Sequence, residues 1–271
     1  MGLENAKEMM TPATKEPLVK DEHGESCKEA WSYASIVGMM MYLASNSRPD
    51  IAFAVHAAAR HTHTPKRVHE VALKRIARYL MGTKHRGMLI RTTTHCQLDL
   101  FVDADFAGLW NIQEANDPVT LRSRTGFVAT LGGNLILWGS KLQTEISLST
   151  TEAEYIAAST ALRSFLPLKR LVNCMLTTFE IQIPEEIEIS MVWEDNNGVI
   201  KMVEAAYPNM TPRSKHIAIK YHWFREHLDE KIDGTTIRMK QVDTTNQLGD
   251  IFTKGIQGED FRNKRKRLIG W

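Results

Sequence analysis

The strongest constraint on the fold is a predicted hairpin at residues 132–134, where the chain reads Gly-Gly-Asn. Apolar and β-branched residues flank this turn at 126–131 and 135–138, which is the pattern of two antiparallel strands. A third strand is predicted at 98–103, because Leu and Val alternate there with Asp and Phe. The strands therefore begin near residue 97, after a region whose apolar residues recur at helical spacing.

Beyond the hairpin, helices and strands alternate, which predicts an α/β fold with a mixed sheet covered by helices. The predicted elements are helix 150–175, strand 187–193, helices 198–206 and 215–231, strand 236–242 and helix 244–254. Pro167 predicts a kink or break in the first of these helices. Residues 109–124 are long and polar for a hairpin loop, and we interpret them as an insertion.

Composition and periodicity divide the chain into four predicted segments. Residues 1–28 contain few large apolar side chains, which predicts a flexible leader. Residues 29–92 predict a small module of three helices, too small to bury much by itself and therefore packed on another surface. Residues 93–256 form the predicted α/β domain, and 257–271 are predicted to be a basic C-terminal tail.

The bulk composition is that of an ordinary globular chain and does not by itself reveal a partner. Of the 271 residues 43% are hydrophobic and 24% charged, and the formal net charge of +2 does not indicate a nucleic-acid binder. No apolar run approaches the ~20 residues that span a membrane, and no secretory signal is visible. The three cysteines are widely spaced, so neither a zinc site nor a disulfide framework is predicted, and we expect an intracellular protein.

Four carboxylates lie at the edges of predicted elements, where they can converge on one pocket. Asp103 ends a strand, Glu154 starts a helix, Asp195 ends a second strand, and Asp250 starts the last helix. Grouped acids repel one another unless a cation lies among them, and oxygen ligands favour Mg²⁺ or Mn²⁺ over zinc. The pattern predicts a metal-dependent nuclease.

Helix geometry distinguishes between the two acids near residue 150. Glu152 and Glu154 lie about 200° apart around a helix, so both cannot face the sheet. Glu154 shares its face with alanine, leucine and phenylalanine, which predicts a buried Glu154 and a solvated Glu152. Asp250 has an alternative explanation to metal binding, because the helix dipole also favours an acid at the start of a helix.

Strand geometry leaves the other two choices open. Asp103 and Asp105 are two residues apart on a strand and point to the same side, so periodicity does not choose between them. Glu194 and Asp195 are successive residues and should point to opposite faces. Only one of this second pair is therefore expected to face the site.

Seven short motifs follow one another along the chain and carry all of these acids. They are Asp103-Ala-Asp-Phe-Ala-Gly108, Arg122-Ser-Arg-Thr-Gly-Phe127, Leu137-Trp-Gly-Ser-Lys-Leu-Gln143, Ser147-Leu-Ser-Thr-Thr-Glu-Ala-Glu-Tyr-Ile-Ala157, Glu194-Asp-Asn196, Arg213-Ser-Lys-His-Ile217 and Asp250-Ile-Phe-Thr-Lys254. Together they resemble the ribonuclease H domain of copia-type LTR retrotransposon Pol polyproteins, over roughly residues 30–256. The helical module resembles the end of the reverse transcriptase segment that precedes this domain.

The resemblance implies a ribonuclease H-like mixed five-stranded sheet with flanking helices, preceded by the small helical module. It also implies an endonuclease that cuts the RNA strand of RNA–DNA hybrids with two Mg²⁺ ions, or Mn²⁺, held by Asp103, Glu154, Asp195 and Asp250. Among the strand acids it selects Asp103 and Asp195. Residues 241–246 lack the histidine that precedes the last acid in many ribonuclease H enzymes, so its role in product release is unassigned.

Substrate-binding residues are predicted after the second strand acid. By resemblance, Asn196 would contact the ribose 2′-hydroxyl of the RNA. Arg213, Lys215 and His216 precede a predicted helix that carries Trp223, and cations near an aromatic ring suit a nucleic-acid backbone. The alternative for this region is a solvated helix face with Trp223 in the core.

Two other functions are weighed against the active nuclease. One is a catalytically inactive ribonuclease H-like domain that binds nucleic acid or connects other domains, and the other is an integrase or transposase of related fold. A polymerase is not predicted, because the chain contains no Asp-Asp dipeptide. The expected partners are an RNA–DNA hybrid and a reverse transcriptase domain in the same or another chain, with no membrane. The expected location is cytoplasmic, in particles, or nuclear.

Overall fold

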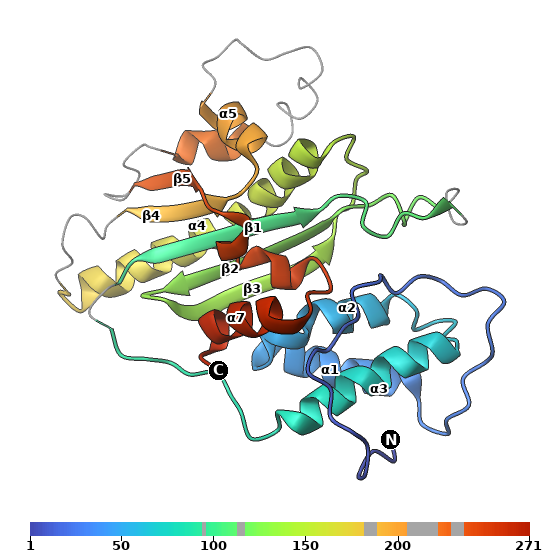
Figure 1. Cartoon of the computed structure of the whole chain (residues 1–271). Helices are drawn as coiled ribbons and strands as arrows, with labels where there is room; N and C mark the ends of the chain where they lie inside the picture. Colours follow the sequence, from blue (N-terminus) through green and yellow to red (C-terminus); the bar gives the residue numbers. More distant parts are fainter. Residues whose placement is uncertain (94–95, 113–116, 182–188, 205–221, 229–235) are drawn as a thin grey trace.

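A twisted five-stranded sheet lies at the centre of the molecule (Figure 1). The computed structural model describes residues 1–93, 96–112, 117–181, 189–204, 222–228 and 236–271. The strands are β1 (Leu98–Asp105), β2 (Arg124–Leu131), β3 (Asn134–Leu142), β4 (Ser190–Glu194) and β5 (Ile237–Gln241). Their spatial order is β3-β2-β1-β4-β5.

The sheet is mixed, as predicted. β1, β2 and β3 pair antiparallel, and the Gly-Gly-Asn hairpin joins β2 to β3 with Leu131 opposite Asn134. β4 pairs parallel with β1, and β5 pairs parallel with β4. Helical segments separate β4 and β5 from the strands before them, as parallel pairing requires. The predicted fold class, a mixed five-stranded sheet with flanking helices, is confirmed.

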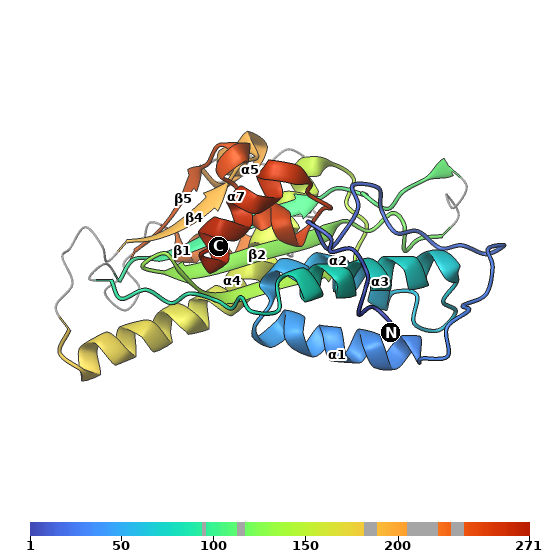
Figure 2. The same cartoon turned by 60° about the horizontal axis from the view of Figure 1, so that its bottom comes forward.

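One face of the sheet is covered by α4 (Thr150–Thr178), which packs on β1 and β2. Leu100, Val102 and Ala129 form a core with alanines, Leu162 and Phe165 of this helix. The helix continues through Pro167, so of the predicted kink or break the break is excluded. The hydrogen bond that proline removes would involve the carbonyl of Arg163, an exposed residue whose carbonyl solvent can satisfy. Beyond this point α4 projects past the sheet (Figure 2).

The opposite face is covered by the helical module and by a C-terminal helix. The helices are α1 (Tyr33–Asn46), α2 (Ala52–Ala59), α3 (Arg67–Gly82) and α7 (Gly258–Ile269), with the short turn η1 (Pro49–Ile51) before α2. Phe101 and Val128 of the sheet share one core with Ile51, Leu73 and Phe261. The indole of Trp138 in β3 also donates to the carbonyl of Ala44, at 2.8 Å. The three helices thus find their packing surface on the sheet, as expected.

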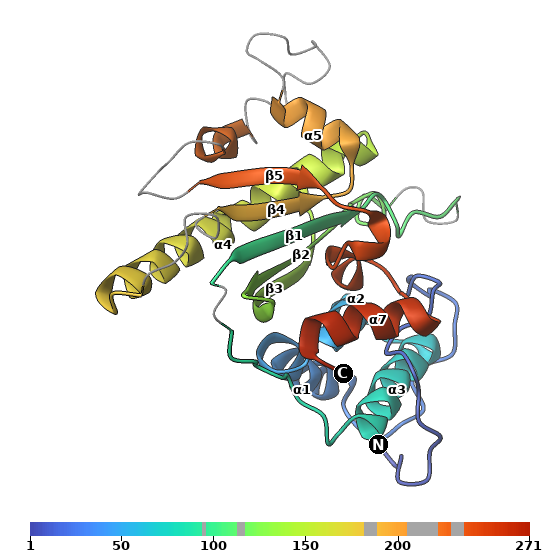
Figure 3. The same cartoon turned by 60° about the vertical axis from the view of Figure 1, so that its left-hand side comes forward.

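Residues 1–28, predicted as a flexible leader, lie along α2 and α3 with little regular structure (Figure 3). The guanidinium of Arg75 donates to the carbonyls of Thr11 and Ala13, both at 3.1 Å. Further along, the rings of His61 and His69 stack at 3.9 Å and reach the carbonyls of Leu18 and Val19. Backbone carbonyls, which the composition does not distinguish, hold this segment in place.

The C-terminal part also differs from its prediction. Residues 257–271 were predicted as a basic tail, yet 258–269 form α7, which buries Phe261, Leu268 and Ile269 against the module. Residues 244–254 form two short 3₁₀ turns, η6 (Thr244–Asn246) and η7 (Gly249–Phe252), in place of one helix. Among the described residues no helix is long and apolar enough to span a membrane.

Candidate metal centre

Three of the four predicted acids meet at the carboxyl ends of β1 and β4. These two strands are parallel neighbours (Figure 3). Phe101 lies opposite Trp193, so Asp103 and Asp195, each two residues further along, lie near the same ends of the two strands. Glu154 reaches this edge from the first turns of α4. One carboxylate oxygen from each of the three lies within 4.8 Å of the others. The structure therefore brings together a strand acid, a helix acid and a second strand acid, with the spacing of ligands to one cation.

Asp103 is the most constrained member of this acid cluster. Its side chain is almost fully buried, with 2% of the residue exposed. Burial raises the pKa of Asp103 to about 7, and the nearby acids Asp250 and Asp195 add to the rise while Lys254 opposes it. The hydroxyl of Thr253 donates a hydrogen bond to the Asp103 carboxylate and fixes its direction.

Glu154 contributes a carboxylate oxygen that is buried and has no hydrogen-bond partner among the described residues. Burial first, and then the charges of Glu194, Asp103 and Asp195, raise the pKa of Glu154 well above its usual range. An acid in this position is costly unless a proton or a cation neutralises it. The buried position of Glu154 agrees with the helix-face argument from the sequence.

Glu152 is buried as well, contrary to the prediction that it is solvated. The amide of Glu152 donates to the hydroxyl of Ser149, and its carboxylate accepts from the amide of Leu148 at 2.8 Å. These two hydrogen bonds connect Glu152 with the N-cap residue Ser149 and with the residue before it, at the start of α4. Glu152 thus fixes the helix start that presents Glu154, and it lies outside the acid cluster.

Glu194 and Asp195 both lie near the site, although strand alternation predicts that only one of them faces it. β4 ends at Glu194, so the alternation of a regular strand no longer applies at Asp195. Glu194 is fully buried and accepts from the amide of Asn196 at 3.0 Å, while its other oxygen has no partner in the described chain. Burial raises the pKa of Glu194 well above its usual range, and Asp195 and Asp103 contribute. Asp195 is the member that joins the cluster, and Thr244 donates to it at 3.0 Å.

Asp250, the fourth predicted acid, lies beside the cluster and is bound by two lysines. The ammonium of Lys254 is 2.5 Å from one carboxylate oxygen, and that of Lys264 is 2.9 Å from the other. Lys254 also lies 3.8 Å from Asp103 and so connects Asp250 with the cluster. Asp250 is therefore neutralised within the chain, unlike Glu154.

None of the sequence motifs predicted that Lys264 binds Asp250. Only 2% of it is exposed, and its ammonium also donates to the carbonyls of Thr244 and Gln247, both at 3.0 Å. A signal was present, because Lys264 falls three residues after Phe261 and four before Leu268, on the apolar face of a helix.

Asp105 lies outside the acid cluster. Of the two strand acids that periodicity could not distinguish, Asp103 is therefore the one in the cluster. It is half-buried at the end of β1, and burial raises its pKa while Lys254 and Arg124 lower it. Its carboxylate folds over Gly108, where an added Cβ would lie 1.7 Å from the Asp105 oxygen. Asp105 thus faces the loop after β1 rather than Glu154.

The predicted substrate-binding residues are only partly described. The side-chain oxygen of Asn196 accepts from the amide of Gly198 at 2.8 Å and starts α5 (Asn197–Glu204), which places Asn196 directly beside Asp195. Arg213, Lys215 and His216 lie outside the described residues. Trp223, in the short turn η5 (His222–His227), is half-buried and donates to the hydroxyl of Ser159 on α4 at 2.8 Å.

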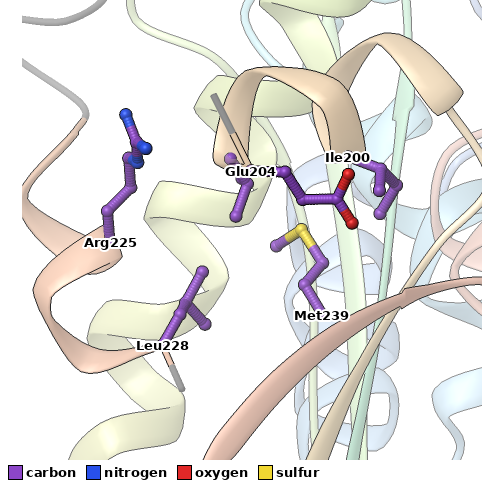
Figure 4. A pocket seen from close by; sticks show the side chains of 6 residues that line it. Ile200, Glu204, Arg225, Leu228 and Met239 are labelled. Carbon is purple, nitrogen blue, oxygen red and sulfur yellow. The ribbon is translucent and has the colours of Figure 1, made fainter. Parts of the chain in front are cut away.

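A separate pocket of about 140 Å³ lies between α5, η5 and β5 (Figure 4). Ile200, Val203, Leu228 and Met239 line it together with one acid and one base, Glu204 and Arg225. None of the cluster acids lines this pocket. It therefore plays no part in the candidate metal centre.

No protein-family model matches the chain. The chain is 32% identical over 263 residues to the "Retrovirus-related Pol polyprotein from transposon RE1" of Arabidopsis thaliana, which covers 97% of this chain and 16% of that protein. It is likewise 32% identical over 277 residues to the "Retrovirus-related Pol polyprotein from transposon TNT 1-94" of Nicotiana tabacum, covering 99% of this chain and 19% of that protein. The chain thus spans less than a fifth of the length of these relatives.

Among solved structures, the N-terminal RNase H domain of a Mycobacterium tuberculosis protein, fused to maltose-binding protein, aligns with a TM-score of 0.38 at 9% identity. That alignment covers 63% of this chain and 97% of the solved one. The likeness to the Pol polyproteins extends over nearly the whole chain. The chain belongs to the copia-type retrotransposon Pol polyproteins.

Proposed function

We propose that this chain is a metal-dependent endonuclease that cuts the RNA strand of RNA–DNA hybrids, as part of a retrotransposon polyprotein or as a truncated copy of one. The observation that carries the proposal is the convergence of Asp103, Glu154 and Asp195, whose carboxylate oxygens lie within 4.8 Å of one another. Membership of the Pol polyprotein family supports the choice of a nucleic acid as the substrate.

The chemistry of the donor set fits a hard divalent cation. All three groups offer oxygen, which Mg²⁺ and Mn²⁺ prefer, and the described part of the cluster includes no thiol or imidazole ligand. One buried oxygen of Glu154 has no hydrogen-bond partner among the described residues, and burial raises the pKa values of Asp103 and Glu154 despite the nearby Lys254, which supports a need for further positive charge at this cluster. When bound, Mg²⁺ would supply that charge, activate a water and stabilise the phosphate under attack.

The surrounding residues keep the three carboxylates in place for this role. Thr253 directs Asp103, Thr244 directs Asp195, and the two hydrogen bonds of Glu152 hold the start of α4. Lys264 holds Asp250 next to them, so that a fourth carboxylate is available at the edge of the site. We propose two ions, with Asp250 as a ligand of the second.

One observation favours a second candidate, a catalytically inactive domain that binds nucleic acid or connects other domains. Both oxygens of Asp250 are engaged by lysines, and Lys254 extends to 3.8 Å from Asp103. A lysine can take the place of a cation in a domain that has lost its metal. In that case the hybrid would be bound and left intact.

In either case the proposed partners are an RNA–DNA hybrid and a reverse transcriptase domain, in the same or another chain, that produces it. The proposed setting is intracellular, either in cytoplasmic particles or in the nucleus. The proposed partners and the proposed setting are inferred from the family and from the proposed substrate.

The direct test is cleavage of a hybrid in which the RNA and the DNA carry different labels. The active chain should cut only the RNA, only with Mg²⁺ or Mn²⁺, and Asp103→Asn should lower the rate at least a hundredfold. Asp99→Asn is the matched control, because Asp99 lies on the same strand and the same side but only accepts from the indole of Trp193. Cleavage that persists in the Asp103→Asn variant would refute the acid cluster as the active site. A hybrid that is bound but not cut would favour the catalytically inactive domain.

A further inference from the structure

A second pocket, of about 150 Å³, lies beside the candidate metal centre. Four of the residues that line it are cationic, namely Lys15, Arg122, Arg124 and Lys254, and one is acidic, Asp105. The pocket therefore concentrates positive charge in a chain whose net charge is only +2. Its walls come from the N-terminal segment, α2, the two ends of the β1–β2 connection and the turn after η7.

Arg124 lines this pocket and is the least exposed of its cations, at 4%. Its guanidinium lies 5.4 Å from the ring centre of Phe53 and donates once, to the hydroxyl of Ser140 at 3.2 Å. A guanidinium has five N–H donors, and the rest have no hydrogen-bond partner among the described residues. A buried, permanently charged group with free donors is costly unless an anion joins it.

The N-terminal segment closes one side of the pocket and is held there firmly. The amide of Gln257 donates to the carbonyl of Ala13 at 2.8 Å. The carbonyl of Thr14 lies so close to Gly255 that a Cβ added there would approach it to 1.9 Å. Lys15 is therefore placed at the pocket by its two preceding residues.

Lys254 and Asp105 connect this pocket with the acid cluster. Lys254 lines the pocket and lies 3.8 Å from Asp103, while Asp105 follows Asp103 by two residues on β1. Asp105 is the one negative group here, and Lys254 and Arg124 both face it. An anion bound by Arg124, Arg122 and Lys15 would thus lie next to the acids without entering the cluster.

We infer that this pocket binds a backbone phosphate of the nucleic acid held at the acid cluster. The inference rests on the proposed function, because it assigns a contact to the same substrate. A planar guanidinium binds phosphate through two parallel hydrogen bonds, and phosphate is the anion that a nucleic-acid backbone offers. Such a contact positions a strand and carries no sequence information. The N-terminal segment and α2 would then form part of the substrate site.

The test is binding of a fluorescent 20-base-pair hybrid to the full chain, measured by anisotropy in EDTA over a series of salt concentrations. Arg122→Gln and Lys15→Gln replace cations that are less buried than Arg124, so folding should not be affected, and Arg124→Gln is measured beside them. Each loss of a phosphate contact should lower the slope of log K against log salt by about 0.9 and weaken binding about tenfold. Lys84→Gln, an exposed cation after α3, is the control and should change neither.

The inference is overturned if the Arg122 and Lys15 variants bind with the wild-type slope, if Lys84→Gln has the same effect, or if the wild type binds no hybrid. Titration with inorganic phosphate separates the two sources of the anion. Binding of phosphate that depends on Arg122 while the hybrid slope does not would indicate a small-anion site and contradict the backbone contact. A chain that shows the predicted slopes but cuts no RNA would refute the proposed nuclease and leave this pocket assigned.

Discussion

The ammonium of Lys264 in α7 lies 2.9 Å from the carboxylate of Asp250 in η7, and both side chains are buried. The same ammonium donates to the carbonyls of Thr244 and Gln247. One lysine of the C-terminal helix thus fixes both turns that follow β5. These turns supply Thr244 to Asp195 and Thr253 to Asp103, so α7 acts on the acid cluster without touching it.

Replacing Lys264 with methionine should therefore destabilise the protein by about 3 kcal/mol, because it leaves one oxygen of the buried Asp250 carboxylate and three backbone carbonyls without their partner. Urea unfolding followed by circular dichroism measures the change. Lys266→Met, two residues further along the same helix but exposed, should stay within about 0.5 kcal/mol of the wild type. Equal losses in the two variants would mean that Lys264 acts only through helix propensity.

The pKa of Asp103 predicts that the metal-free protein loses stability as the pH rises. The folded protein retains a proton up to about pH 7, whereas the unfolded chain releases it near the ordinary value of 3.8. Rising pH in this window therefore favours unfolding, by about 1.4 kcal/mol for each unit of pKa shift.

Asp103→Asn removes this titration, so in EDTA the variant should gain stability over the wild type between pH 5 and pH 8. Urea midpoints of both proteins at the two pH values measure the difference. Parallel pH profiles for the two proteins would show that Asp103 is ionised throughout and would contradict the raised pKa.

The stacked pair His61 and His69 predicts the opposite pH dependence for the N-terminal segment. Burial, and then the charge of His69, lower the pKa of His61 to about 4 from its usual 6.5, and burial lowers that of His69 as well. The unfolded chain binds more protons in this window, so the stability that these rings provide is lost as the pH falls from about 6.5 to 4.

Hydrogen exchange of residues 10–20 should accordingly increase at pH 5 relative to pH 7.5, after correction for intrinsic rates. His69→Gln should make the segment exchange rapidly at both values, whereas His63→Gln, at an exposed position, should leave it protected at pH 7.5. Protection that does not change with pH would contradict the role of the pair.

Gly126 on β2 predicts a steric limit close to the site. A Cβ at this position would lie 2.5 Å from Thr253 and 2.9 Å from the carbonyl of Gly249, so the strand and the η7 turn touch through it. Gly126→Ala should cost about 2 kcal/mol through this overlap. Gly38→Ala, in α1 with open space around it, should instead stabilise by up to about 1 kcal/mol. Thermal unfolding of both variants measures these changes in stability. Equal effects of the two substitutions would refute the close contact between β2 and the η7 turn.

The sheet, its strand types and the buried position of Glu154 were predictable because they depend on local periodicity. The role of α7 was not inferred, because the many cations at 262–267 led to the prediction of a solvated basic tail. Phe261, Lys264 and Leu268 are nevertheless buried on one face of the helix. The pairing of Asp250 with Lys264 joins two short elements whose relative position no local pattern determines. Glu194 and Asp195 lie together because β4 ends between them, where alternation ceases to apply.

Calorimetric titration of Mg²⁺ and Mn²⁺ into the chain at pH 6.5 tests most directly whether Asp103, Glu154 and Asp195 form one cation site. Because Asp103 and Glu154 have raised pKa values, cation binding should release protons, seen as a heat that differs between buffers of different ionisation enthalpy. Glu154→Gln should abolish binding, while Asp99→Asn should leave it unchanged. Binding that persists in Glu154→Gln, or no binding by the wild type, would contradict the account.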